Sequence, residues 1–143
     1  MTIRLSRLFS PASWRGVSKS YSALRRARKQ YVRGENEAAL RSLEECLGRM
    51  SVVPFEYTAF HAGLLVLNHR YAEAARLYRH VLTATEGDSR QRSRYAAAVS
   101  RYYLSLIDEG SDALDRWREA KAQQPRRGVG WKYLGLPSTP VLH

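Results

Sequence analysis

The chain has 143 residues, of which 24 are Lys or Arg and 13 are Asp or Glu, so its formal net charge is +11. A chain of this length forms one compact domain with its own apolar core, and 44% hydrophobic residues exclude a disordered basic tail. The single cysteine, Cys46, excludes an internal disulfide framework and a four-cysteine zinc site, and no apolar run reaches the roughly 18 residues of a membrane-spanning helix.

The first 34 residues hold most of the excess positive charge. They contain nine basic residues and no acid, whereas residues 35–143 contain the other fifteen basic residues and all thirteen acids. An electrostatic function is therefore expected at the N-terminal end of the chain.

Residues 1–20 are predicted to form a basic N-terminal arm. Leu5, Leu8 and Phe9 share one helical face, while Arg4 and Arg7 lie off it, which gives a short amphipathic segment. Such a segment can dock in a groove of a partner protein, lie on an anionic membrane surface or belong to an organellar targeting sequence. These three interpretations, and a frayed terminus without a function, stay open at this point.

The rest of the chain is predicted to be helical nearly throughout. Apolar residues recur with the helical period, and no alternating run of β-branched residues is bounded by hairpin signals. Gly34 is expected to follow the first helix, Pro54 to open the third and Pro125 to end the last. The six predicted helices span approximately residues 13–32, 36–49, 54–68, 71–85, 89–107 and 112–124.

The second helix of each predicted pair carries the same pattern of three residues. A small residue is followed four positions later by a large apolar residue, and three positions after that by another residue on the same helix face. The pattern recurs at intervals of 35 and 39 residues. Its three copies are Ala39, Leu43 and Cys46; Ala74, Tyr78 and Val81; and Ala113, Trp117 and Ala120.

These spacings resemble the tetratricopeptide repeat family, whose unit of 34 residues forms two helices joined by a turn. The segment from Arg70 to Tyr78 is similar to the turn and second helix of such a unit, although no Trp precedes Ala62 at the family position. In the third unit, Trp117 and Pro125 lie at the family spacing. The resemblance implies an all-α fold in which antiparallel helix pairs stack into a right-handed superhelix, a TPR-like solenoid.

The same resemblance divides the chain into three parts. The repeat domain is expected over residues 21–135, after the basic arm of residues 1–20. Trp131 to Leu134 is interpreted as a capping segment that covers the apolar end of the third unit, because prolines stop the helix soon afterwards. Residues 136–143 are expected to form an irregular tail.

No group of side chains in the sequence indicates catalysis. Cys46 lies at a packing position of the second predicted helix, so a buried thiol is expected. His61, His69 and His80 are eight and eleven residues apart, which matches no helical metal site. Phosphate-binding and nucleophile motifs are absent from the sequence, so the protein is predicted to be no enzyme and to bind neither a metal nor a cofactor.

Arginines and tyrosines lie close together in the fifth predicted helix, as they do on many nucleic-acid-binding surfaces. Tyr95 and Tyr102 share a helical stripe with Ala98, Val99 and Leu106, however, so core packing is the favoured interpretation for both tyrosines. The arginines expected to stay exposed on the other side are Arg90, Arg94 and Arg101.

The family resemblance implies a non-catalytic scaffold or adaptor, or a small subunit of a larger assembly, that binds a protein or peptide on its concave surface. The basic N-terminal region predicts an acidic partner and binding that weakens with salt. RNA within a ribonucleoprotein is the second interpretation, and an anionic membrane surface is the third. The expected location is the cytoplasm, or an organelle matrix if the N-terminus is a targeting segment. The candidate partner-binding residues are Arg4, Arg7, Arg15, Arg25, Arg28, Phe60 and Leu67.

Overall fold

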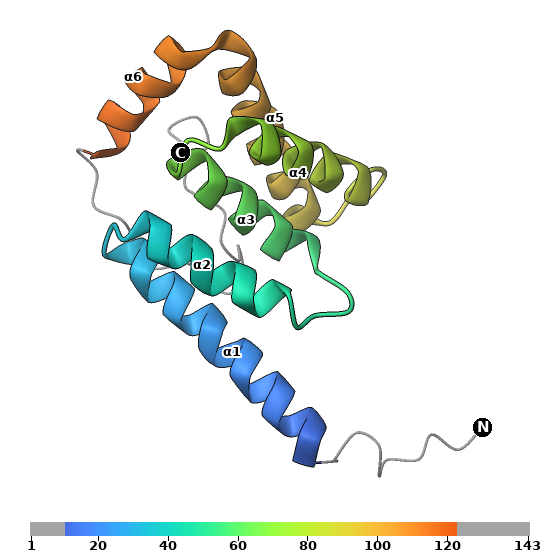
Figure 1. Ribbon diagram of the computed structural model, residues 1–143. Helices are drawn as coiled ribbons and strands as arrows, with labels where there is room; N and C mark the ends of the chain where they lie inside the picture. Colours follow the sequence, from blue (N-terminus) through green and yellow to red (C-terminus); the bar gives the residue numbers. More distant parts are fainter. Residues whose placement is uncertain (1–10, 123–143) are drawn as a thin grey trace.

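The computed structural model describes the backbone of residues 11–122 and the side chains of residues 21–120. This part of the chain is entirely helical and contains no strand, which confirms the all-α prediction (Figure 1). Its helices are α1 (Pro11–Val32), α2 (Asn36–Leu47), α3 (Phe55–Leu67), α4 (Tyr71–Ala84), α5 (Gln91–Glu109) and α6 (Ser111–Ala122). The predicted arm boundary at residue 20 falls inside α1. The predicted cap at Trp131 to Leu134 lies outside the described residues.

Two helix ends repeat the same backbone geometry 35 residues apart. Gly34 has φ +81°, and the N–H of Glu35 donates to the carbonyl of Gln30 at 2.9 Å. His69 has φ +63°, and the N–H of Arg70 donates to the carbonyl of Leu65 at 2.9 Å. A left-handed residue followed by such a bond is a common way to satisfy the last carbonyls of a helix. The chain therefore leaves α1 and α3 in the same way, at the interval of the sequence repeat.

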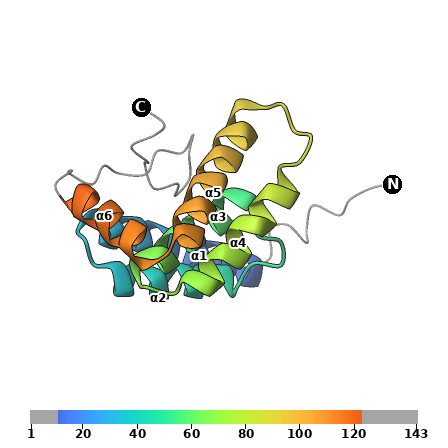
Figure 2. The same ribbon diagram turned by 90° about the horizontal axis from the view of Figure 1, so that it is seen from above.

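Each helix packs mainly against its neighbours in the sequence. The pairs in contact are α1 with α2, α2 with α3, α3 with α4, α4 with α5 and α5 with α6, and α3 also contacts α5. Figure 2 shows the same succession from a second direction. The connecting turns are short, so helices that follow one another in the sequence are neighbours in space.

The small and large residues of the sequence repeat form the contacts between these helices. Ala39 and Leu43 in the first pair and Ala74 and Tyr78 in the second each have 0% exposure. In the third pair the predicted burial of Ala120 is wrong, because its side chain is exposed in the last turn of α6. Within the described residues, no further helix follows α6 to cover that turn.

The middle helix, α3, is buried on almost every side. Nine of its thirteen residues are buried, including both polar residues of its first turn, Glu56 and Thr58. The buried Glu56 carboxylate pairs with Arg92 of α5 at 2.7 Å. At the other end of α3, the guanidinium of Arg118 donates to the carbonyl of Val66 at 3.2 Å and lies 5.2 Å from the ring centroid of Tyr71. Charged side chains of α5 and α6 thus hold both ends of α3.

The buried face of α5 differs from the predicted stripe. Tyr95 and Tyr102 are half-buried against the core, as expected, but the fully buried ring belongs to Tyr103. Small residues lie on the same face, Ala96 and Ser100, and both have 0% exposure. Because α5 contacts α3, α4 and α6, it buries a wider surface than the single stripe of a two-helix contact.

Three aromatic rings join the last three helices. The ring of Tyr78 in α4 stacks on that of Tyr103 in α5, with centroids 5.3 Å apart and planes 4° from parallel. Trp117 of α6 meets Tyr103 edge-on at 5.4 Å. Rings in these two arrangements attract one another beyond the gain from burial alone. We refer to Tyr78, Tyr103 and Trp117 as the aromatic stack.

Candidate partner-binding surfaces

A row of basic side chains follows the outer side of α1. Arg25 and Lys29 of α1 and Arg33, the first residue after the helix, are spaced four residues apart and are all exposed. The N–H of Arg33 still donates to the carbonyl of Lys29 at 3.1 Å, so the helical spacing continues to Arg33. The other side of the helix is turned to the core, where Leu24 and Ala27 are 2% and 0% exposed. Residues four apart lie above one another on a helix, so these three side chains form one continuous stripe. We refer to Arg25, Lys29 and Arg33 as the α1 basic stripe.

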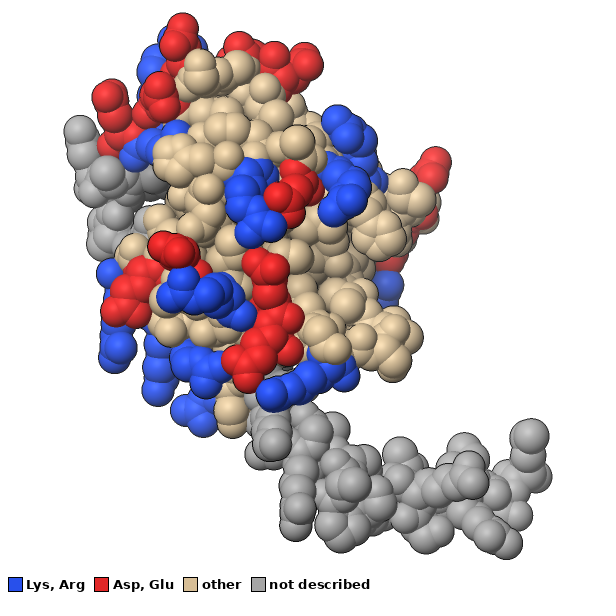
Figure 3. Space-filling model, viewed as in Figure 1, with Lys and Arg blue, Asp and Glu red and all other residues tan. Residues whose placement is uncertain are grey.

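The α1 basic stripe forms no ion pair with an acid among the described side chains. Lys29 and Arg33 form no ion pair or side-chain hydrogen bond there, and the guanidinium of Arg25 lies 5.9 Å from the ring centroid of Tyr21. Basic side chains follow one another along the lower left edge in Figure 3, where Figure 1 places the second half of α1. The stripe therefore presents positive charge that the rest of the described fold does not neutralise.

Arg26, although next to the stripe in sequence, joins α1 to α2. Its Nε donates to the Ser42 hydroxyl at 3.1 Å, and its Nη2 lies 2.7 Å from Glu45 Oε2. The Ser42 hydroxyl in turn donates to Gln30 Oε1 at 2.6 Å. These bonds hold the two helices of the first pair together, so Arg26 serves the fold rather than a partner.

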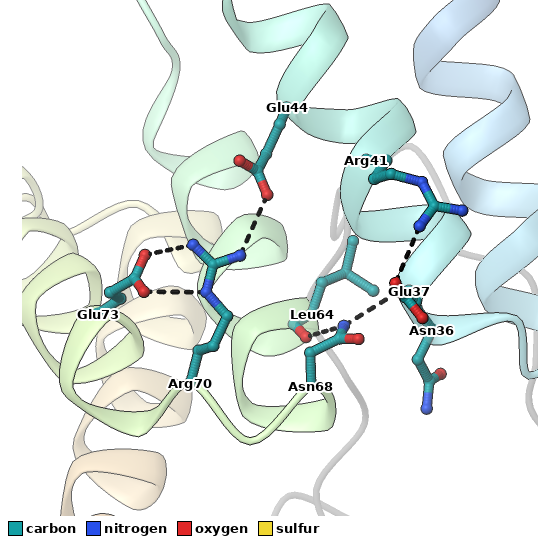
Figure 4. A network of polar contacts seen from close by, with 8 residues as sticks. All are labelled: Asn36, Glu37, Arg41, Glu44, Leu64, Asn68, Arg70 and Glu73. Carbon is teal, nitrogen blue, oxygen red and sulfur yellow. Dashed lines mark hydrogen bonds and ion pairs between the residues drawn. The ribbon is translucent and has the colours of Figure 1, made fainter.

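Acidic side chains also lie over α2 and the start of α4 (Figure 3), and Glu37, Glu44, Glu45 and Glu73 each pair with an arginine. Arg70 lies between two helices, with its Nη1 3.6 Å from Glu44 of α2 and its Nη2 2.7 Å from Glu73 of α4 (Figure 4). The hydrogen bond from Arg70 is the main reason why the pKa of Glu73 is lowered. The acids of this face are thus used within the fold, whereas the α1 basic stripe forms no ion pair with the described side chains.

An amide and a backbone carbonyl reinforce the contact beside this network. The Asn68 side chain donates from Nδ2 to the carbonyl of Asn36 at 3.0 Å and to that of Leu64 at 2.7 Å (Figure 4). It thereby ties the end of α3 to the start of α2. The first and second helix pairs are joined by directional bonds as well as by apolar packing.

The candidate residues with described side chains, Arg25, Arg28, Phe60 and Leu67, differ in how far they are exposed. Arg25 is exposed on α1, whereas Arg28 is half-buried, and burial lowers its pKa although Tyr57, Tyr21 and Cys46 oppose that shift. Arg4 and Arg7 lie outside the described residues. Arg15 belongs to α1, but its side chain is not among those described.

Phe60 and Leu67 on α3 do not lie on an open concave surface, contrary to the sequence-based expectation. Phe60 is only 2% exposed, and its ring meets that of Tyr31 edge-on at 5.9 Å. Leu67 is half-buried against the same core. The physical reason is that α3 is covered from several directions, so its apolar residues are needed for packing.

The Cys and His side chains and the other groups capable of chemistry are either buried or scattered. Cys46 is 2% exposed, and burial raises the pKa of its thiol, as expected for a packing cysteine. Burial also lowers the pKa of His61, against a smaller opposite effect of Glu44. Within residues 11–122, no three His, Cys, Asp or Glu side chains converge so as to hold a metal ion.

Lys29 and Arg33 are not among the candidate binding residues that the sequence suggested. Their four-residue spacing from Arg25 was the available signal, because it predicts one exposed face of a helix. Arg79 of α4 was not a candidate either, and it lines a hollow together with Arg101 of α5. No local pattern connects these two arginines, since they are brought together only when α4 packs on α5.

Comparison with known protein families, characterised proteins and solved structures finds no match for this chain. Among the described helices, none combines the length and the apolar character needed to cross a bilayer. The surfaces of the molecule itself are therefore the basis on which its function is inferred.

Proposed function

We propose that this chain is a non-catalytic helical-repeat scaffold of tetratricopeptide type that binds an acidic protein partner through the α1 basic stripe. The strongest support is the stripe itself, in which Arg25, Lys29 and Arg33 are exposed and meet no described acid. Exposed charge of one sign steers and orients a partner of the opposite sign. The neighbouring Arg26 and Arg70, by contrast, are already paired within the fold.

The repeat character of the scaffold is supported by the register of the helices. The left-handed residues Gly34 and His69 are 35 residues apart, as are the buried residues Ala39 and Ala74. Stacked pairs that repeat in this way generate a superhelix with a surface available to partners. A scaffold, adaptor or small assembly subunit is the role that this architecture commonly serves.

Nucleic acid, most simply RNA, is the second candidate ligand. The net charge of +11 and the contact of Arg25 with the Tyr21 ring favour a polyanion with stackable bases. Attachment to an anionic membrane depends on residues 1–12, most of which lie outside the described part of the chain. The buried Cys46 thiol fits the reducing conditions of the cytoplasm or an organelle matrix.

The decisive experiment compares two triple variants of the full-length protein. One carries Arg25→Gln, Lys29→Gln and Arg33→Gln; the other carries Arg41→Gln, Arg76→Gln and Arg116→Gln, which removes the same charge from other exposed sites. Partners are captured with each variant, identified by mass spectrometry, purified and titrated back. We expect the stripe variant to bind the same acidic protein at least about five-fold more weakly, because three charge contacts are lost.

The matched variant should keep nearly full affinity, and added salt should weaken binding of the wild-type protein. Titration with a labelled single-stranded RNA tests the second candidate. A steep linear fall of log affinity with log salt that the stripe variant flattens would favour RNA over a protein partner. Equal losses in both triple variants would show that only net charge matters and would refute the proposed site.

A further inference from the structure

The helices α4 and α5 lie away from α1 (Figure 1). A furrow runs along the contact between α4 and α5. It consists of two adjoining hollows of about 880 Å³ and about 560 Å³, and Arg101 lines both. Its charged lining includes Glu86 and Arg94 in the larger hollow and Arg79 and Asp108 in the smaller one. We refer to this feature as the α4–α5 furrow.

The central arginines of the furrow are free of ion pairs. Arg79, Arg94 and Arg101 are exposed and have no acidic partner among the described side chains. Two other arginines at the start of α5 are engaged: Arg90 lies 2.6 Å from Asp88, and Arg92 lies 2.7 Å from Glu56. The furrow therefore keeps unmatched positive charge at its centre even though acids are close by.

The charged side chains of the furrow have a definite order, with acids at the two ends and arginines in the centre. Arg94 and Arg101 are seven residues apart on one face of α5, which corresponds to about 10 Å along the helix. Asp108 follows seven residues after Arg101, and Glu86 lies beyond Arg94 in the loop before α5. The order is thus acidic, basic, basic and acidic.

Small side chains form part of the lining between these charges, beside the larger Leu82 and Tyr95. Ala97 and Ala98 line the larger hollow together with Thr83 of α4. Small residues leave room for the backbone of a bound segment to approach the helix surface. An extended chain advances about 3.3 Å per residue, so about three residues span the distance from Arg94 to Arg101.

The two terminal segments that the structure does not describe have the same sign of charge as the centre of the furrow. Residues 1–10 and 123–143 contain five basic residues and no acid. The central arginines would repel either segment. The complementary charge is therefore sought in a partner protein.

We propose that the α4–α5 furrow binds an extended segment of a partner protein that has an acidic centre with basic residues on both sides. The acidic centre meets Arg94, Arg101 and Arg79, while the flanking basic residues meet Glu86 and Asp108. A long nucleic acid fits less well, because its uniform negative charge would be repelled at both ends of the furrow. This site is independent of the α1 basic stripe.

The test uses two labelled peptides of identical composition and zero net side-chain charge. One has four Glu in the centre and two Lys at each end; the other has four Lys in the centre and two Glu at each end. Because the two have equal net charge, general attraction to a basic protein cannot separate them. We expect the full-length protein to bind the Glu-centred peptide about three- to ten-fold more tightly at low salt, from contacts to exposed arginines.

Two matched variants locate the effect. Arg94→Gln with Arg101→Gln should abolish the preference, whereas Arg76→Gln with Arg116→Gln, which removes equal charge outside the furrow, should preserve it. Amide NMR shifts of Gly87 and Ala98 should move on titration of the wild-type protein with the Glu-centred peptide, and amide spectra of the variants confirm that each is folded. Equal affinity for both peptides, or a preference that survives in the furrow variant, would overturn the proposal.

The proposals for the α1 basic stripe and for the α4–α5 furrow can be tested separately. The variant with Arg25→Gln, Lys29→Gln and Arg33→Gln should keep the preference for the Glu-centred peptide. If it loses the preference, the peptide is bound at α1 and the furrow proposal is wrong. If a single-stranded RNA binds and is weakened by Arg94→Gln with Arg101→Gln while neither peptide binds, the furrow is a nucleic-acid site instead.

Discussion

The first helix pair and the last three helices are held together by different kinds of side chain. In the first pair, small residues such as Ala27 and Ala39 allow α1 and α2 to approach closely, and Arg26 and Ser42 add hydrogen bonds at the edge. In the last three helices, the aromatic stack of Tyr78, Tyr103 and Trp117 fills the space between the helices. Stability is thus spread along many contacts in one region and concentrated in a few rings in the other.

This difference also separates stability from binding. The contacts of the first pair leave the outer side of α1 uninvolved, so Lys29 and Arg33 can bind a partner at little cost to the fold. Tyr103 contacts the rings of Tyr78, Tyr102 and Trp117 and has 0% exposure, so it contributes to the fold alone. Substitutions in the two regions should therefore change different measured properties.

The largest effect is expected for Tyr103→Ala. The substitution removes a fully buried ring that touches Tyr78 and Trp117, so the free energy of unfolding should fall by about 3–5 kcal/mol. Urea denaturation followed by circular dichroism measures the loss. Tyr102→Ala is the matched control, since this half-buried neighbour should cost clearly less. Equal losses would contradict the special role of the aromatic stack.

Leu43→Ala tests the first pair at the position equivalent to Tyr78. Leu43 has 0% exposure, so the substitution should cost about 2–3 kcal/mol, the lower part of the usual range, because the adjoining small residues allow the helices to close part of the cavity. The same denaturation experiment gives the value. A loss as large as that of Tyr103→Ala would show that the two regions do not differ in how their stability is distributed.

The features that the sequence predicted correctly depend on neighbouring residues. Gly34 and Pro54 mark helix boundaries because their backbone preferences act locally. The burial of Leu43 and Tyr78 follows from spacing within one helix. Each of these predictions depends on residues less than about a dozen positions apart, so it can be made without knowing the tertiary fold.

The features that the sequence did not predict depend on how many helices surround a residue. Phe60 was expected on an accessible surface. Because α3 is apolar on nearly all sides, the spacing of its apolar residues does not show which side of the helix faces the core. Tyr103 was missed for a related reason, since α5 has three helical neighbours rather than one. Likewise, only tertiary packing decides that Arg26 is paired while Lys29 is not.

Ser42→Ala should have a smaller effect in the first pair. It removes the acceptor for Arg26 Nε and the donor to Gln30, and both bonds are only partly buried, so the expected loss is about 1 kcal/mol. Thermal unfolding at neutral pH measures it. The double variant with Arg26→Ala should cost less than the sum of the single losses, because the two residues share one bond. Strict additivity would show that this bond contributes nothing.

The smallest effect concerns pH and the loop between α4 and α5. Hydrogen bonds from the Arg90 side chain, the Arg90 backbone and Ser93 hold the pKa of Asp88 well below its usual range. A carboxyl with a lowered pKa stabilises the fold above its unfolded value of about 3.9, and this contribution is lost as the pH falls toward the folded value. The melting temperature of the wild-type protein should therefore decline between pH 5 and pH 2.

Asp88→Asn removes this ionisation, so the variant should melt slightly lower at neutral pH but lose less on acidification. The two melting curves should approach each other at low pH. Arg90 and Ser93 remain in place, which makes the slope against pH, rather than the absolute stability, the informative quantity. Parallel slopes in the two proteins would mean that the Asp88 carboxylate is not selectively stabilised in the folded state.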